Sequence, residues 1–220
     1  MSADAEKRLA AEAAAALVED GMTVGLGTGT TVEHLVPALA ARGLDIRCVA
    51  TSPRTEHQAR ALGLKVVSFD GPDAPDRLDL AIDGADQVGA DGWLVKGGGG
   101  AHTREKRVAA AAARFAVIVS SDKLFERVGP PIPLELLAFG LAATLRSLGD
   151  ARLRDAPPTP DGGVLADLSE RVDDPRALSA RLAATPGVVE HGLFPPELVW
   201  CVIVGEGSGV RRIDVSEART

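Results

Sequence analysis

The stretch "MTVGLGTGTTVEHLVPALAARG", residues 22–43, predicts a β-strand, a glycine- and threonine-rich turn and an α-helix in succession. Apolar residues at 22–27 are typical of a buried strand, and apolar residues at helical spacing follow until Gly43 ends the helix. The same alternation predicts helices at 4–19, 54–63 and 103–115 and strands at 46–52, 65–69, 78–83, 93–97 and 116–121. Strands joined by helices imply crossover connections. We therefore expect an α/β fold with a Rossmann-like, mostly parallel sheet and helices on both faces.

The pattern changes near Gly129. Residues 129–140 predict a proline-rich junction that leads into a helix ending near Leu148. Two strands around a Pro/Gly loop follow at 151–169, then a helix at 174–185 and strands around 188–194 and 199–205. This predicts a smaller α+β domain at 129–198, and an α/β catalytic domain at 1–128 and 199–220.

Composition excludes several classes of protein. The 220 residues carry a formal net charge of −7 and no basic run, which argues against nucleic acid or an anionic membrane as a partner. No segment reaches the ~20 apolar residues of a membrane span, and the N-terminus lacks the apolar stretch of a signal peptide. Cys48 and Cys201 lie in apolar runs, as buried free thiols do. These features predict a cytoplasmic protein.

Three unusual stretches follow predicted strands: "GLGTGTT" (25–31), "DGADQ" (83–87) and "KGGGGAHTRE" (96–105). In an open parallel sheet, ligands bind outside the carboxyl ends of the strands. The sequence therefore predicts that these stretches meet on one edge of the sheet and form a ligand site there.

"GLGTGTT" does not match the dinucleotide fingerprint, because Thr30 stands where the third glycine belongs and no acid ends the next strand. It also lacks the Gly-Lys-Ser/Thr of a Walker loop. Two interpretations remain. The turn binds a phosphate through backbone N–H groups, hydroxyls and a helix N-terminus, or it is a tight turn with a threonine cap.

In "DGADQ", Asp83 and Asp86 can face the same cleft, or they can be solvated acids of an Asx-type turn. We expect no metal site and no cofactor, because His34, His57, His102 and His191 are scattered along the chain.

The run "KGGGG" raises the question of why four costly glycines precede a helix. Lys96 is predicted to end a strand, Thr103 to cap the next helix, and Glu105 to lie in its first turn. Glu105 can complement the helix dipole. It can also act as a base, with Lys96 and bare N–H donors around it, for proton abstraction next to a carbonyl.

With these motifs, the sequence resembles the type A ribose-5-phosphate isomerase family. The resemblance covers nearly the whole chain. It rests on the three stretches above, on "LVKGGGGAHTREK" as the most specific motif, and on "TSPRTEHQARALGL", "DLAIDGADQ", "VSSDKL", "PIPLE" and "PGVVEHGLF".

The resemblance implies an aldose–ketose isomerase of the non-oxidative pentose phosphate pathway. The enzyme would interconvert D-ribose 5-phosphate and D-ribulose 5-phosphate through a cis-enediolate, without a metal or cofactor. The catalytic residues would be Glu105 as the base, Asp83 in ring opening, and Lys96 at the reacting oxygens. The substrate-binding residues would be Lys7, Thr28, Gly29, Thr30, Thr31, Asp83, Gly84, Ala85, Asp86, Lys96, Gly97, Gly98, Gly99 and Lys123.

The chain departs from the family pattern at Gln87, Gly100 and His102, and "TPDGGV" (159–164) replaces a different loop. None of these changes removes a group from the implied mechanism. His102 is expected to be an exposed bystander near Glu105.

Two other classes fit the fold. Sugar-phosphate sensing domains of transcription regulators are related, but we expect a helix-turn-helix and a basic face in such a protein. A deaminase or an acyl-CoA transferase fits by fold analogy alone. The smaller domain is expected to be a lid or an assembly domain. Its excess of apolar strands predicts a homodimer or homotetramer, with a small pentose phosphate as the only other partner.

Overall fold

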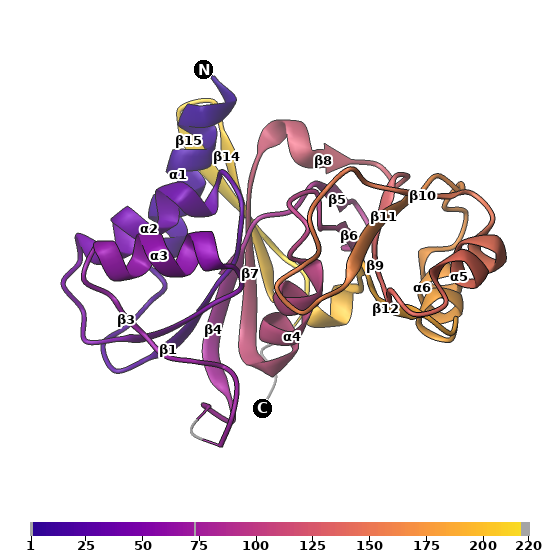
Figure 1. Ribbon diagram of the computed structural model, residues 1–220. Coiled ribbons are helices and arrows are strands. Elements are labelled where there is room, and N and C mark those ends of the chain that lie inside the picture. The colour runs from indigo at the N-terminus through magenta and orange to yellow at the C-terminus, as the bar shows by residue number, and fades with distance from the viewer. Residues whose placement is uncertain (1, 73, 217–220) are drawn as a thin grey trace. The chain divides into compact units, whose positions relative to one another are not determined.

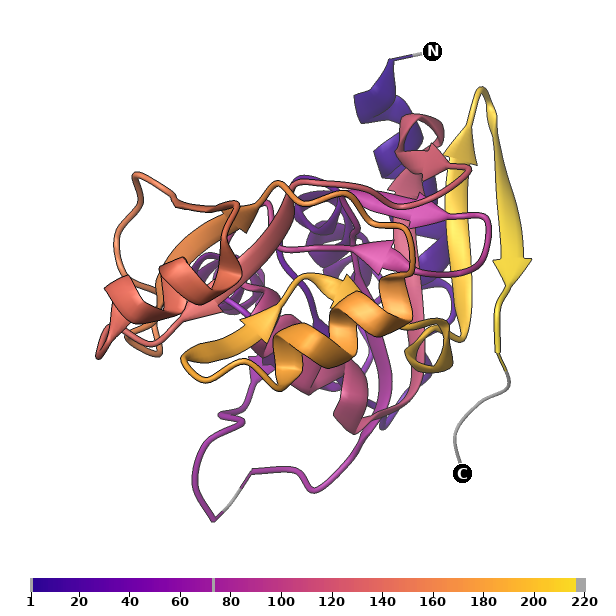
Figure 2. The same ribbon diagram turned by 90° about the vertical axis from the view of Figure 1, so that its right-hand side faces the viewer.

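Seven strands form the main sheet of the computed structural model, which describes residues 2–72 and 74–216 (Figure 1). Their spatial order is β15-β14-β7-β4-β1-β2-β3. Neighbouring strands are parallel except at the edge, where β14 (Cys201–Glu206) and β15 (Gly209–Asp214) form an antiparallel hairpin (Figure 2). The predicted mostly parallel α/β sheet is confirmed.

The other elements of this sheet alternate as predicted from the sequence. The remaining strands are β1 (Thr23–Leu26), β2 (Arg47–Ala50), β3 (Lys65–Val66), β4 (Leu78–Asp83) and β7 (Ala112–Ser120). The helices are α1 (Ala3–Ala15), α2 (Val32–Ala40), α3 (Pro53–Ala61) and α4 (His102–Ala111), with short 3₁₀ turns η1 (Ser121–Lys123) and η2 (Pro196–Leu198).

The boundary between α4 and β7 differs from the prediction. The alanine-rich segment was expected to stay helical to residue 115, but β7 begins at Ala112, where it pairs with Leu78 of β4. Ladder hydrogen bonds and burial in the sheet outweigh the helix propensity of alanine, which is a weak preference.

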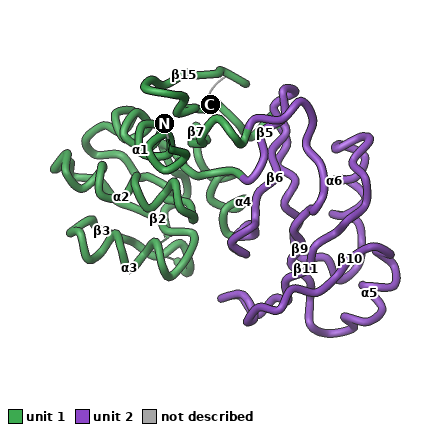
Figure 3. The backbone as a smooth tube through the Cα atoms, turned by 90° about the horizontal axis from the view of Figure 1, so that it is seen from above, with its two compact units in different colours: residues 1–85, 104–123, 196–220 green, residues 86–103, 124–195 purple. Residues whose placement is uncertain are grey.

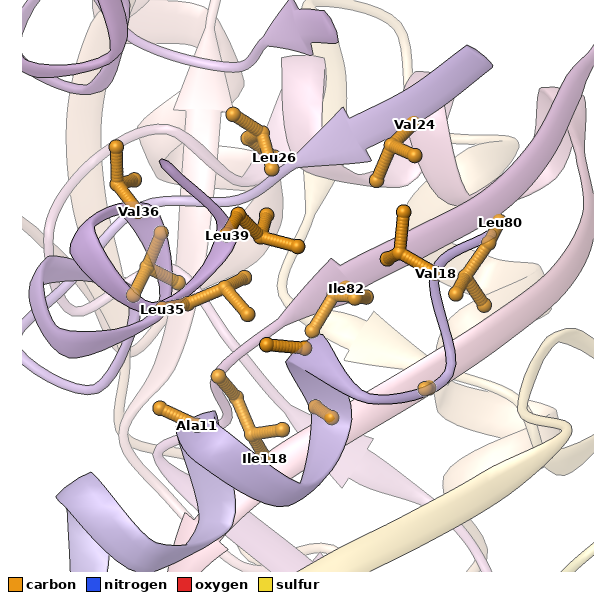
Figure 4. Close-up of a cluster of buried hydrophobic side chains, with 14 of the residues drawn as sticks. Ala11, Val18, Val24, Leu26, Leu35, Val36, Leu39, Leu80, Ile82 and Ile118 are labelled. Carbon is orange, nitrogen blue, oxygen red and sulfur yellow. The ribbon is translucent and has the colours of Figure 1, made fainter. Parts of the chain in front are cut away.

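Alternate residues of the central strands face opposite layers of helices. Val24 and Leu26 of β1 and Leu80 and Ile82 of β4 pack against side chains of α1, α2 and α3 in one apolar cluster (Figure 4). Gly25 faces the other way. A Cβ added to it would lie 2.4 Å from Cγ1 of Val108 on α4. Helices therefore cover both faces, and Gly25 lets α4 pack close to the sheet.

The chain divides into two compact units, shown in separate colours in Figure 3. The first comprises residues 1–85, 104–123 and 196–220, and holds the seven-stranded sheet. The second comprises 86–103 and 124–195. Residues 86–103 were expected in the first domain, whereas they cluster with the second unit.

The second unit contains two four-stranded sheets. The first has the order β10-β11-β9-β12 and is antiparallel: β9 (Ile132–Leu136), β10 (Ala151–Leu153), β11 (Val164–Leu168) and β12 (Val188–His191). The second has the order β13-β6-β5-β8: β5 (Gln87–Gly89), β6 (Leu94–Val95), β8 (Leu124–Phe125) and β13 (Leu193–Phe194). The helices are α5 (Leu141–Leu148) and α6 (Pro175–Ala183).

Two expectations for this unit need correction. Residues 132–136 were included in a junction leading to a helix, but they form the central strand β9, because all five residues are buried between β11 and β12. Lys96 follows β6 as expected, but β6 belongs to the second unit's own sheet and not to the parallel sheet. The two strands predicted around the Pro/Gly loop, β10 and β11, are confirmed.

Candidate active site

Asp83 lies where β4 ends, directly beside the end of β1. These two strands are hydrogen-bonded neighbours, and the strand order runs outward from this pair in both directions. Such a switch point in an open α/β sheet is where ligands bind. Of the three stretches expected on one edge of the sheet, "GLGTGTT" and "DGADQ" do follow neighbouring strands of it. The third, "KGGGGAHTRE", follows β6, which belongs to the second unit's own sheet.

The carboxylate of Asp83 is held by backbone donors. It accepts hydrogen bonds at Oδ1 from the N–H of Thr28, 3.0 Å away, and from the N–H of Gly84, 2.7 Å away, and only 3% of the residue is exposed. A Cβ on Gly27 would come within 1.9 Å of the same carboxylate. Gly27 is therefore required so that the β1 turn can approach Asp83.

The turn after β1 presents hydroxyls and a helix start. The Thr28 hydroxyl lies 2.8 Å from that of Thr51, and Gly29 has a φ of 123°, in the left-handed region that favours glycine. Thr31 precedes α2 without capping it through its side chain. The turn therefore offers donors at a helix N-terminus, as phosphate sites do.

Two lysines of the first unit lie on segments near this sheet. The ammonium of Lys7, on α1, donates to the Thr30 hydroxyl at 2.9 Å, which places it at the β1 turn. Lys123 ends η1 and lies 3.3 Å from the carboxylate of Asp122. Both were implied to contact a phosphate, and Lys7 touches the turn through this bond.

Glu6 fixes the segments that carry these lysines, a role that sequence reasoning missed. Its carboxylate accepts from the N–H of Ser121 at 3.0 Å, from the Ser121 hydroxyl at 2.8 Å and from the N–H of Gly207 at 3.1 Å. These three donors hold the pKa of Glu6 below its ordinary value, the Ser121 hydroxyl having the largest effect. An acid beside Lys7 in the sequence gave no signal of this arrangement.

Glu105 lies in the first turn of α4, as predicted, and is 5% exposed. A carboxylate buried to this degree is unusual for a residue that would only complement a helix dipole at a surface. Burial shields a base from water and favours proton transfer to a bound substrate. Its position agrees with the role implied by the resemblance.

Lys96 is anchored in the second unit. It is 2% exposed, its N–H donates to the carbonyl of Gly192 at 2.9 Å, and its ammonium lies 5.5 Å from the centre of the Phe194 ring. A Cβ on Gly192 would lie 2.1 Å from the Lys96 carbonyl oxygen. Gly192, within the quoted "PGVVEHGLF", is therefore a supporting residue that the motif alone did not reveal.

Different physical reasons require glycine at different positions of the run Gly97–Gly100. Gly97 and Gly100 have φ values of 105° and 75°, which disfavour other residues. Added Cβ atoms would lie 2.6 Å from His102 at Gly97, 2.8 Å from Asp86 at Gly98 and 2.5 Å from Leu165 at Gly100. Close packing within the second unit thus accounts for three of the four glycines. Gly98 and Gly99 are exposed.

His102 and Thr103 differ from expectation. His102 is completely buried rather than exposed, because its ring packs against the bare backbone of Gly97. Thr103 lies inside α4 and does not cap it; its hydroxyl donates to the buried carboxylate of Glu135. The family departure Gln87 is also explained, because its amide makes two hydrogen bonds, of 3.0 and 2.8 Å, with the backbone of Gly129.

Among residues 2–72 and 74–216, no three His, Cys, Asp or Glu side chains gather closely enough to hold a metal ion. No helix within the same residues is long and apolar enough to cross a membrane. The two cysteines are free and buried, and burial raises the pKa of Cys48 to about 12 and that of Cys201 to about 11.

The switch point, the threonine turn and the buried carboxylates define a doubly wound α/β enzyme. Comparison with known proteins then gives the particular family. The family model for ribose 5-phosphate isomerase A (phosphoriboisomerase A) matches residues 47–209. A model of the DeoR C terminal sensor domain also matches, over residues 2–69 only.

Individual relatives agree over nearly the full length. The ribose-5-phosphate isomerase A of Caulobacter vibrioides is 43% identical over 97% of this chain and 99% of its own. The crystal structure of ribose 5 phosphate isomerase A from Neisseria gonorrhoeae is 31% identical, covers 98% of this chain and 99% of its own, and has a TM-score of 0.92. A D-ribose-5-phosphate isomerase in complex with phospho-erythronic acid is 32% identical over 97% of this chain and all of its own, with a TM-score of 0.90. This chain belongs to the ribose 5-phosphate isomerase A family and is an isomerase.

Proposed function

We propose that this protein interconverts D-ribose 5-phosphate and D-ribulose 5-phosphate, the reaction of its family, through a cis-enediolate with Glu105 as the base. The observation that carries the assignment of the base is the 5% exposure of this carboxylate in the first turn of α4. A general base must reach the substrate proton and be shielded from water, and such a base contributes about 10²–10⁴-fold to the rate.

The isomerisation only moves protons and electron pairs within the sugar, so it needs no outside oxidant. Glu105 takes the proton from C2 of the open-chain aldose, and the C–H electron pair forms the C1–C2 double bond while the C1 carbonyl becomes the enediolate oxygen. The proton is then delivered to C1. The O2 hydroxyl proton moves to O1, and C2 becomes the ketone carbonyl.

Asp83 is proposed to act on the sugar hydroxyls and in ring opening. Its carboxylate is fixed by the N–H groups of Thr28 and Gly84, so it does not need to reorganise when substrate arrives. We assign the phosphate to the turn Thr28–Thr31 with Lys7 and Lys123. Lys7 supports this assignment because its ammonium already lies at Thr30.

Lys96 and the backbone of Gly97–Gly99 are proposed to stabilise the negative charge that develops on the reacting oxygens. Backbone N–H groups are the donors in this role, and glycines carry no side chains that could cover them. Gly84, Ala85 and Asp86 complete the proposed substrate contacts. A relative forms a complex with phospho-erythronic acid, which carries both a carboxylate and a phosphate. We expect this compound to compete with the substrate here.

The second unit is proposed to act as a lid and assembly unit of a cytoplasmic homodimer or homotetramer. Several large apolar side chains of this unit are exposed: Leu137 at 51%, Phe139 at 88%, Leu153 at 48% and Val189 at 49%. Leu153 and Val189 lie on the edge strands β10 and β12, and Leu137 and Phe139 follow β9. Large apolar side chains left exposed in this number favour a role in subunit contacts.

The proposal is tested by isomerising ribose 5-phosphate in D₂O with EDTA present. The enediolate mechanism predicts ribulose 5-phosphate that carries deuterium at C1, and activity that survives chelation. Activity lost with EDTA and restored by a divalent ion, with the C2 hydrogen transferred entirely to C1, would replace the enediolate with a metal-assisted hydride shift. A chain that does not convert the substrate at all would contradict the proposed function.

A further inference from the structure

The glycine segment, residues 97–100, is hydrogen-bonded to an arginine that belongs to none of the sequence motifs and has no role in the proposed mechanism. Arg154 follows β10, and its Nη1 donates to the carbonyl oxygens of Gly97 at 2.8 Å and Gly98 at 3.2 Å. All of these residues belong to the second unit. These contacts join residues 57 and 56 positions apart in the sequence, so they reflect the fold and not local chain geometry.

The guanidinium is itself held in place. Its Nε and Nη2 donate to the two carboxylate oxygens of Asp167 on β11, at 2.8 and 2.6 Å. The Arg154 N–H also donates to the carbonyl of Leu165 at 2.9 Å, and the side chain is only 18% exposed. A planar guanidinium with two partners on one side presents its remaining N–H groups in a fixed direction.

The same segment is bound from its N–H side. The N–H of Gly98 donates to Asp86 at 2.7 Å, so the peptide between Gly97 and Gly98 is fixed at both ends. In a trans peptide the carbonyl and the following N–H point in opposite directions. Because the Gly98 carbonyl faces Arg154, the N–H of the exposed Gly99 points away from Arg154.

We propose that Arg154 is a positioning residue that orients the Gly99 N–H, by holding the Gly97 and Gly98 carbonyls, as a donor to the reacting oxygens of the substrate. The proposal rests on the proposed function, in which this segment lines those oxygens. The guanidinium also polarises the two carbonyls, and hydrogen bonds in a chain strengthen one another. The second unit then supplies backbone preorganisation as well as a lid.

A purely structural role for the Arg154–Asp167 pair would tie β10 to β11 and affect stability alone. The variant Arg154→Lys distinguishes the positioning role from the purely structural role. An ammonium keeps the charge, but it cannot hold Asp167 through two parallel bonds and reach both carbonyls. Arg152→Lys is the matched control, because Arg152 lies on β10 two residues away and is exposed.

We expect Arg154→Lys to lower kcat for ribose 5-phosphate by about 10–100-fold, somewhat less than the loss of an oxyanion donor outright. KM should change by less than about threefold, because the phosphate contacts lie elsewhere. Arg152→Lys should match the wild type. In Arg154→Ala, added guanidine should restore part of kcat, since a free guanidinium can bind the vacated carbonyls.

Amide hydrogen exchange gives a readout that does not depend on activity. The Gly98 and Gly100 amides should exchange faster in Arg154→Lys than in Arg152→Lys, because their bonds to Asp86 and to the Gly97 carbonyl depend on the fixed segment. Inactivity of the wild type would contradict the proposed function. The exchange result would still show whether Arg154 fixes the backbone of residues 97–100. Unchanged kcat and unchanged exchange in Arg154→Lys would overturn the inference. So would equal losses in both lysine variants.

Discussion

Asp86 and Gly98 fit against each other with no room for a side chain. The Asp86 carboxylate accepts the Gly98 N–H at 2.7 Å, and a Cβ on Gly98 would lie 2.8 Å from one of its oxygens and 3.1 Å from the other. Gly98 does not have a positive φ. The need for glycine at this position therefore comes from the neighbouring carboxylate and not from backbone strain.

The first prediction follows from this contact. Gly98→Ala should displace Asp86 and break its bond to the segment, so substrate conversion should fall at least tenfold, while the melting temperature changes by only a few degrees because both residues are exposed. Gly98→Val should be worse. Steady-state kinetics and thermal unfolding check this. The control is Gly63→Ala, at a distant positive φ, which should cost stability without changing KM.

The second prediction concerns the base. Glu105→Gln keeps the size and hydrogen-bonding capacity of the side chain but cannot accept a proton. We expect kcat to fall about 10²–10⁴-fold or more, with KM and the melting temperature little changed. Glu12→Gln, an exposed residue paired with Arg8 on α1, is the control and should behave as the wild type. Near-normal turnover by Glu105→Gln would leave this glutamate as a helix-start residue only.

The third prediction separates binding from chemistry. Each charge-assisted hydrogen bond to a phosphate is worth about 1.5–3 kcal/mol. Lys123→Ala and Lys7→Ala should therefore raise KM more than they lower kcat, and both should weaken inhibition by inorganic phosphate. Lys65→Ala, an exposed lysine on β3, is the control. A lysine whose removal leaves KM unchanged is not at the phosphate.

The sequence predicts the parts of this protein that depend on local pattern. Strand–helix alternation predicted the parallel sheet, and the placement of Asp83 at the end of β4 followed from one hydrophobic run and its polar end. Glu105 was found for a similar reason, since the start of its helix is marked by glycines. Each of these signals lies within about ten residues of chain.

Features that depend on distant contacts could not be predicted. The central strand β9 lacks alternation because it is buried throughout. Pro133 within it and Pro131 just before it resemble a junction. Arg154 and Glu6 act on residues 56 and 115 positions away, and their own neighbours in the sequence carry no pattern. The glycine run was interpreted as ligand space, whereas much of that space is filled by His102, Asp86 and Leu165.

The fourth prediction tests the exposed apolar side chains of the second unit. Phe139 is 88% exposed, and burying an aromatic side chain of this kind is worth about 1.5–3 kcal/mol. If it lies in a subunit contact, Phe139→Ser should shift the oligomer toward monomer in light scattering at micromolar concentration. Leu62→Ser, an exposed residue at the end of α3, should leave the mass unchanged. A wild-type monomer would contradict the proposed assembly.

The last prediction concerns the stability of the first unit as a function of pH. The pKa of Glu6 is held below its ordinary value, near 4.5, by the Ser121 hydroxyl first and then by the N–H groups of Ser121 and Gly207. In the unfolded chain these donors are lost and the pKa returns to that ordinary value. The charged form is thus favoured by folding, so its contribution is fully present above the unfolded pKa and is lost as the pH falls through the folded pKa.

Glu6→Gln removes this titration. Urea unfolding should show the variant to be less stable than the wild type at pH 7, with the difference shrinking as the pH falls from about 5 toward 3. Glu12→Gln, on the same helix but exposed and paired with exposed Arg8, should show no such pH-dependent difference. If the difference in the free energy of unfolding between wild type and Glu6→Gln stays constant across this range, the carboxylate charge does not stabilise the folded state. The tie from α1 to Ser121 and Gly207 would then depend on side-chain packing alone.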